Sequence, residues 1–157
     1  MPLLLALLVA PAPIVAWAPP AGAATIAEHA TTTTEELAFY GLVNEARAAH
    51  GLGPLQYDPA LSAAAADWAA VMAGTGVLAH DPDLVANIDA AVGPDWTYYG
   101  GNVGMGGDVA GLHAAFMASG THAANVLGPY DRVGVGVVWS GSTMWVNFIF
   151  LGGGSPA

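Results

Sequence analysis

Residues 133–150 read VGVGVVWSGSTMWVNFIF, and this stretch decides the fold class. Valines at 133, 135 and 137 alternate with small residues, which is the period of two that a β-strand shows. The following MWVNFIF is rich in β-branched and aromatic residues, which favour strands. Turn-forming residues 140–142 (Ser-Gly-Ser) lie between the two runs, so we predict a β-hairpin.

The segments upstream of the hairpin have the spacing of helices. A capping box of Thr33 and Glu36 predicts a helix that ends before Gly51. Asp58 followed by Pro59 predicts the start of a second helix, which we expect to run to about Met72 and to pack closely through its alanines. Further helices are expected over 83–91, over 108–119 with Asp108 as the cap, and over 121–127. Helices followed by strands indicate an α+β fold in one domain.

Residues 96–107, WTYYGGNVGMGG, contain five glycines in twelve positions and are interpreted as a loop. Gly104-Met105-Gly106 begins a dinucleotide-binding pattern, but position 109 is Val where the third glycine is required. The chain also has no lysine and therefore no phosphate-binding P-loop. We expect these glycines to bring the backbone close to a neighbouring element.

The composition excludes several partners and chemistries. The chain has 2 Lys+Arg against 12 Asp+Glu and a net charge of −10, which argues against nucleic acid as a partner and against binding to anionic membranes. Each of the two arginines, Arg47 and Arg132, is expected to have a structural partner because cations are so scarce. Cysteine is absent, which excludes disulfides, thiolate metal sites and cysteine nucleophiles.

The N-terminus indicates export. The apolar run LLLALLVA (3–10) is too short to span a bilayer, and Ala21-Gly22-Ala23 matches a signal-peptidase site, although no Lys or Arg precedes the run. We therefore predict a signal peptide over 1–23, a linker over 24–34, and a globular domain over 35–152. The protein is expected to be secreted and, after cleavage, not an integral membrane protein. The alternative is an apolar tail or an uncleaved anchor.

Local patterns alone give no catalytic site. The sequence lacks G-x-S-x-G and H-E-x-x-H, and no two histidines have the i, i+4 spacing of a helical zinc site. His113 falls within a predicted helix and is interpreted as a packed residue. By spacing alone a metal site is the less favoured interpretation of the histidines, which are His29, His50, His80, His113 and His122.

Five motifs in order resemble the CAP superfamily (cysteine-rich secretory proteins, antigen 5, pathogenesis-related proteins), in particular its bacterial, SCP-like extracellular branch. They are LVNEARAAHGLGPLQYDPALSAAAADWAA (42–70), LAHDPD around His80, GGNVG (100–104), FMASGTHAANVL (116–127) and the hairpin. The resemblance implies an α-β-α sandwich, with a small antiparallel sheet between helix layers. It also implies a surface cleft with two histidines and two glutamates, in which the histidines can hold a divalent metal.

The histidines of that cleft correspond to His80 and His122, but its glutamates have no counterpart. The G-E-N glutamate of the family falls on Gly101, and no Glu follows Glu45. Asp81 and Asp108 are nearby acids at non-matching positions, and the family's aromatic Trp is Phe116. Asn102 matches the family's asparagine and is expected to anchor neighbouring backbone through its amide.

Three functions remain open. The first is a secreted, non-catalytic protein that binds a lipid, another small apolar ligand or a cell-envelope component. The second is a hydrolase that depends on a divalent metal, zinc or magnesium, held by His80 and His122. The third is a purely structural or interaction module. We favour the first because both cleft carboxylates are absent, and a carboxylate is the usual general base or metal partner beside histidine.

Overall fold

The computed structural model describes residues 32–154; the expected signal peptide and nearly all of the expected linker lie outside this range. The elements in chain order are α2 (Thr34–Ala49), β1 (Gln56–Tyr57), α3 (Pro59–Thr75), α4 (Leu84–Val92), β2 (Tyr98–Gly106), α5 (Val109–Ala118), α6 (Gly120–Val126), β3 (Arg132–Ser140) and β4 (Thr143–Gly152). None of the helices in this range is long and apolar enough to cross a bilayer.

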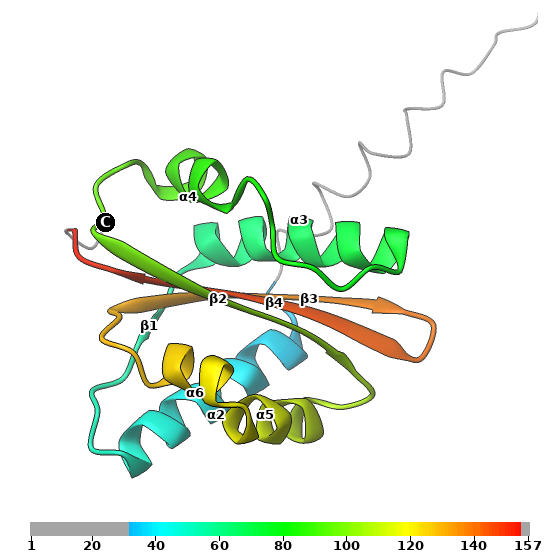
Figure 1. The fold of residues 1–157 in the computed structure, drawn as a ribbon, viewed down its shortest axis with the longest axis horizontal. Coiled ribbons are helices and arrows are strands. Elements are labelled where there is room, and N and C mark those ends of the chain that lie inside the picture. Colours follow the sequence, from blue (N-terminus) through cyan, green and yellow to red (C-terminus); the bar gives the residue numbers. More distant parts are fainter. Residues whose placement is uncertain (1–31, 155–157) are drawn as a thin grey trace, which may run out of the picture.

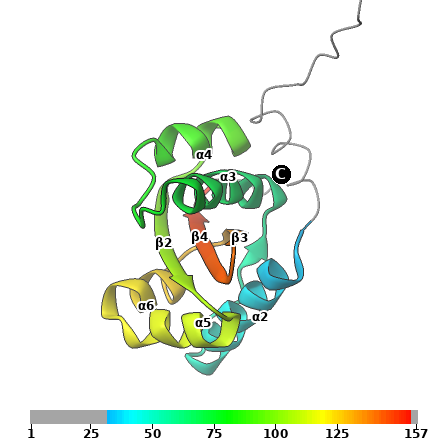
Figure 2. The same cartoon turned by 90° about the vertical axis from the view of Figure 1, so that its right-hand side faces the viewer.

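The fold is the expected α+β sandwich of three layers. Helices α3 and α4 cover one face of the sheet, and α2, α5 and α6 cover the other (Figures 1 and 2). The strand order is β1-β3-β4-β2. The short β1 pairs in parallel with β3, whereas the other pairs are antiparallel, so the sheet is mixed rather than wholly antiparallel as the resemblance implied.

The predicted hairpin is confirmed and forms the centre of the sheet. Ser140 pairs with Thr143, and Gly141 between them has φ +61°, a conformation that favours glycine in a two-residue turn. The valines of β3 are buried in one cluster with α2 side chains such as Phe39. The side chains of Val133, Val135 and Val137 therefore form the face of β3 that packs against α2.

On the other face of β3, Gly134 and Gly136 lie against helix α3. A Cβ added at Gly136 would overlap the backbone nitrogen of Ala66, and one at Gly134 would overlap Leu61. The backbone of helix α3 thus lies directly on the sheet at these two glycines, and the small Ala65 and Ala66 are buried at Gly136. The alternating Val-Gly sequence encodes two surfaces, one for side-chain packing and one for close backbone approach.

The predicted helix starts are confirmed. Thr33 and Glu36 form a complete capping box, Asp58 accepts from the first amides of α3, and Asp108 accepts from Gly111 N at 2.7 Å. The predicted end of α3 near Met72 is wrong, because the helix continues to Thr75 and stops at Gly76. Gly76 is the residue in the left-handed conformation, with φ +68°, and so provides the C-terminal cap.

The interpretation of residues 96–107 as a loop is wrong, because most of the stretch is strand β2. Three of its glycines, Gly100, Gly104 and Gly106, lie on the face covered by α5 and α6, where a Cβ at Gly104 would lie 2.6 Å from Phe116 Cζ. A Cβ at Gly100 would lie 2.8 Å from Asn125 Oδ1. The expected close approach of backbone to a neighbour is therefore real, but it occurs within a strand.

The outer edge of β3 is completed by side chains. The two-residue β1 covers only its first residues. Beyond that point Val135 N donates to Ser62 Oγ (3.0 Å) and Val137 N donates to the buried Glu36 Oε1 (3.2 Å). These side-chain oxygens take the place of the carbonyl groups of a longer partner strand. Without them the buried N–H groups of Val135 and Val137 would have no acceptor.

Candidate functional site

Two of the residues predicted for the cleft, Gly101 and Asn102, lie on β2, the edge strand that pairs with β4. Successive strand residues face opposite sides of a sheet. Gly101 therefore faces the α3–α4 layer, where a Cβ would lie 3.7 Å from Leu84 Cδ2. Asn102 faces the opposite layer, where its amide donates to the His122 carbonyl at 3.0 Å. Gly101 and its neighbour Asn102 thus face opposite sides of the sheet, the first toward His80 and the second toward the His122 backbone.

His80 lies beside Gly101. A Cβ at residue 101 would be 3.9 Å from His80 Nδ1, so a side chain at this position would extend directly alongside the imidazole. His80 is exposed and belongs to the segment between α3 and α4. The Trp68 indole fixes this segment by donating from Nε1 to the Ala79 carbonyl at 2.7 Å.

The backbone at Gly101 has room for a side chain. The nearest atom to an added Cβ is Phe148 O at 3.4 Å, an ordinary van der Waals contact, and φ is not positive. In contrast to Gly100 and Gly104, nothing in the packing demands glycine here. Packing therefore does not explain why residue 101 is glycine, where the resemblance to the CAP superfamily implies a glutamate.

His122 is held from two sides on α6. Its Nδ1 lies 2.9 Å from Ser119 Oγ, and its ring packs against Phe116 with centroids 5.2 Å apart. The Nδ1 contact with Ser119 leaves Nε2 as the nitrogen that can bind a ligand or a metal, since each ring nitrogen has a single site.

Asn102 is fully buried and acts as an anchor. Its Oδ1 accepts from Asn125 Nδ2 at 2.8 Å, and the same Asn125 amide donates to Gly101 O at 3.0 Å. This is the backbone-tying role expected of Asn102. Asn125 was not predicted as a site residue, although it lies within the motif 116–127. Its amide joins α6 to β2 and so sets where His122 lies relative to the strand.

The two acids considered as replacements serve local structure. Asp81 accepts from Asp83 N and from Asn87 Nδ2, both at 2.8 Å, and Asp108 caps α5. Across residues 32–154, neither carboxylate hydrogen-bonds to His80 or His122. Over the same range no three His, Cys, Asp or Glu side chains are grouped so that they could hold a metal ion.

The fold perturbs the protonation of His113 on α5. Burial on α5 lowers the pKa of His113, while the nearby Glu45 carboxylate raises it by a smaller amount. Its Nδ1 is buried without a hydrogen-bond partner among the described residues. The neutral ring is therefore the form that the fold favours, which agrees with the interpretation of His113 as a packed residue.

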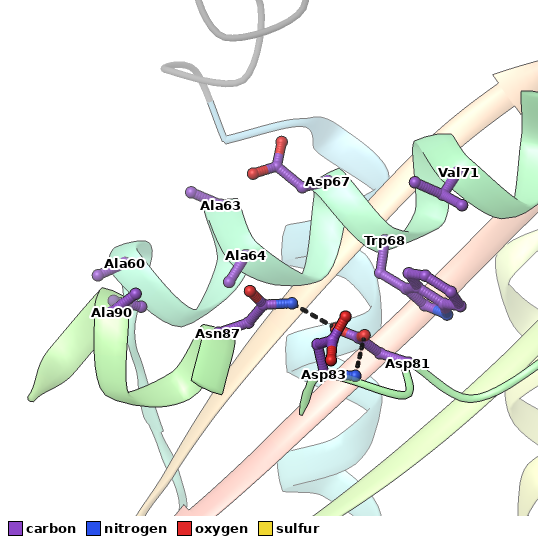
Figure 3. Close-up of a pocket in the computed structure, with 11 residues that line it drawn as sticks. Ala60, Ala63, Ala64, Asp67, Trp68, Val71, Asp81, Asp83, Asn87 and Ala90 are labelled. Atoms are coloured by element: carbon purple, nitrogen blue, oxygen red, sulfur yellow. Dashed lines mark hydrogen bonds between the residues drawn. The ribbon is translucent and has the colours of Figure 1, made fainter. Parts of the chain in front are cut away.

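Three prominent cavities of the described chain have linings that include none of His80, His122, Gly101 and Asn102. The first is a groove of about 560 Å³ between the outer faces of α3 and α4, beside the segment that carries His80 (Figure 3). The second is lined by residues that include Arg132, and the third by residues that include Thr32.

Comparison with known proteins defines the class. The model of the CAP family, described as the cysteine-rich secretory protein family, matches residues 40–150. The match covers more than half of the chain, and the protein therefore belongs to the CAP family. No curated protein matches the sequence.

Solved structures share the fold at low sequence identity. An outer surface protein of Borrelia burgdorferi is 16% identical with a TM-score of 0.70, and the match covers 78% of this chain and 96% of that one. A cysteine-rich secretory protein of Staphylococcus aureus is 25% identical (TM-score 0.61; coverage 74% and 38%). An SCP-domain extracellular protein of Bacillus anthracis is 21% identical (TM-score 0.66; coverage 75% and 40%). This chain thus spans about two-fifths of the last two proteins.

Proposed function

We propose that this protein is an exported, non-catalytic CAP domain that binds a lipid, another small apolar ligand or a cell-envelope component. The observation that carries the proposal is Gly101. Its Cβ position lies beside the His80 imidazole, where the family has a carboxylate, and glycine offers no base or metal ligand. The rest of the scaffold is retained, including the buried Asn102 anchor. A preserved scaffold without its acid favours binding over hydrolysis.

A hydrolase that uses a divalent metal is the second candidate, and one observation favours it. His80 lies beside Gly101, the His122 backbone contacts the adjacent Asn102, and the Ser119 contact leaves Nε2 of His122 as the nitrogen available to a metal. Zinc commonly binds imidazole nitrogens, but two neutral imidazoles leave half of a tetrahedral site to water or to the substrate.

Turnover by the purified protein separates the two candidates. Peptide and cell-wall substrates are incubated with the protein in the presence of zinc or magnesium, beside the double variant His80→Ala/His122→Ala. We expect no turnover above that of the double variant. Metal-dependent turnover that disappears in the double variant would establish the hydrolase instead.

Ligand binding is tested with the same two proteins. Fluorescent fatty-acid displacement and vesicle sedimentation are measured with neutral and zwitterionic lipids, because the net charge of −10 disfavours anionic ones. Saturable binding supports the lipid version. Binding to no lipid class leaves the cell-envelope version, which cross-linking to cell-wall fractions addresses.

Export of the protein is tested by the position of its mature N-terminus. The extracellular and outer-surface descriptions of the structural neighbours support secretion of this chain. We expect the protein recovered from the culture medium to begin at Ala24, after cleavage at Ala21-Gly22-Ala23. Retention of an intact N-terminus in the membrane fraction would indicate an uncleaved anchor.

A further inference from the structure

The groove between α3 and α4 has an apolar floor that no side chain fills. Helix α3 turns its larger apolar residues, such as Leu61 and Met72, toward the sheet. Where its outer face meets α4, the apolar lining consists mainly of methyl groups. Five alanines from the two helices line the groove, namely Ala60, Ala63, Ala64, Ala90 and Ala91.

An aromatic wall closes one end of the groove. Trp68 lines it, with a half-buried ring (Figure 3). The Trp68 N–H is already used by the Ala79 carbonyl, so the ring orientation is fixed and the indole offers its π-face and edge rather than a donor. Indole faces attract organic cations more strongly than other aromatic rings do.

Carboxylates surround this floor without a compensating cation. Asp67, Asp81 and Asp83 line the groove together with Asn87, and no Lys, Arg or His of the described chain does so. Both carboxylate oxygens of Asp81 already accept hydrogen bonds, one from Asp83 N and one from Asn87 Nδ2. Asp67 and Asp83, in contrast, are exposed. The potential at the groove is therefore negative.

The chain's own cations are committed elsewhere. Arg47 donates to the Val126 and Gly128 carbonyls, and Arg132 pairs with Asp58 at 3.2 Å. The net charge of −10 adds a long-range attraction for any positive ligand.

We propose that this groove binds an alkylammonium group, with the ammonium beside Asp83 and Asp67 and the alkyl chain on the alanine floor against Trp68. A bare metal ion fits less well, because no three acids or histidines among residues 32–154 are grouped to coordinate one. An alkylammonium combines the two properties that the groove offers, a negative rim and an apolar bed. It occurs both in free polyamines and in lysine side chains of a partner protein. The proposal is independent of the histidine cleft.

Calorimetry on the purified protein at fixed ionic strength tests the chemistry, with methylammonium and hexylammonium as probes. Hexylammonium is expected to bind at least about tenfold more tightly, because its methylene groups leave water on the alanine floor. Equal affinity for the two probes would overturn the proposal, since it would reduce the binding to general attraction of cations.

Variants locate the site. Asp83→Asn is expected to weaken hexylammonium binding by about three- to fivefold, as suits an exposed charge pair. Ala90→Leu, which fills the groove without changing charge, is expected to weaken it further. Asp95→Asn removes the same charge from an exposed position outside the groove and serves as the matched control. Equal weakening by Asp83→Asn and Asp95→Asn, or full affinity in Ala90→Leu, would contradict the proposed site.

The natural source is resolved by two further titrations, with spermidine and with a short peptide that carries one lysine between leucines. Tighter binding of spermidine identifies a polyamine site, and tighter binding of the peptide identifies a docking site for a lysine side chain. Binding of neither at a concentration where hexylammonium saturates the protein would contradict the proposal that the groove serves a natural alkylammonium.

Discussion

At the scale of single residues, the glycines of this chain have distinct roles that the sequence alone does not separate. Gly136 lies against the backbone of α3, and Gly104 lies against the Phe116 ring. Gly101 lies in the same sheet yet has room for a side chain. The first two are required for packing, whereas packing alone does not require glycine at the third position.

Substitution by alanine distinguishes these roles. Gly136→Ala is expected to lower the free energy of unfolding by about 1–3 kcal/mol, because the new Cβ overlaps Ala66 N and the helix must move away. Gly101→Ala, the matched control, is expected to change it by less than about 0.5 kcal/mol. Urea unfolding followed by tryptophan fluorescence measures both. Equal effects would show that the contact between α3 and β3 is not as close as described.

His113 predicts a pH dependence of stability. Its pKa is lowered in the folded state, chiefly by burial, so the unfolded chain binds the proton more readily. The stability that the neutral His113 ring contributes is fully present above its ordinary pKa of 6.5. This stability is lost as the pH falls below that value. We expect His113→Leu to unfold with a smaller loss of stability between pH 7.5 and 5 than the parent, by urea titration at each pH. An unchanged slope in this variant would assign the loss to other groups.

At the scale of elements, side chains rather than strand length complete the sheet. Glu36 caps α2 through Thr33 N and also accepts from Val137 N of β3, so one carboxylate joins helix start and strand edge. Ser62 likewise accepts from Val135 N. These contacts explain how a two-residue β1 suffices at this side of the sheet.

Removal of the Glu36 carboxylate is expected to be costly. Glu36→Ala leaves the buried Val137 N–H unsatisfied and should destabilise the fold by about 1–3 kcal/mol. Glu35→Ala, one residue earlier in the same helix turn, removes an equal charge without that contact and should cost about 0.5 kcal/mol or less. Thermal unfolding of both variants provides the comparison. Similar losses would mean that Glu36 acts only through the helix dipole.

Most elements could be predicted from local sequence, and the exceptions have a physical cause. The capping residues Thr33, Asp58 and Asp108 mark helix starts because they act within one turn. The glycines of β2 predicted a loop because glycine disfavours strands in isolation. Their strand conformation depends on Phe116 and Tyr130, which approach from elements remote in sequence. The Asn125 anchor was missed for the same reason, since its partners Gly101 and Asn102 are 24 and 23 residues away.

At the scale of the whole molecule, the sandwich supports two surfaces with different chemistry. One is the part of β2 at Gly101 and Asn102, which lies beside His80 and contacts the His122 backbone. The other is the acidic groove between α3 and α4. Together they describe a CAP domain that we infer to bind rather than to cleave.

We infer that Gly101 deprives His80 and His122 of the carboxylate that a metal site would need. The most direct measurement is the melting temperature with and without micromolar zinc, for the parent, for Gly101→Glu and for Gly101→Glu/His80→Ala. We predict no zinc-dependent rise for the parent, a rise of about 3 °C or more for Gly101→Glu, and its loss in the double variant, because a ligand that binds only the folded state must raise the midpoint. A comparable rise for the parent, abolished by His80→Ala or His122→Ala, would contradict the claim.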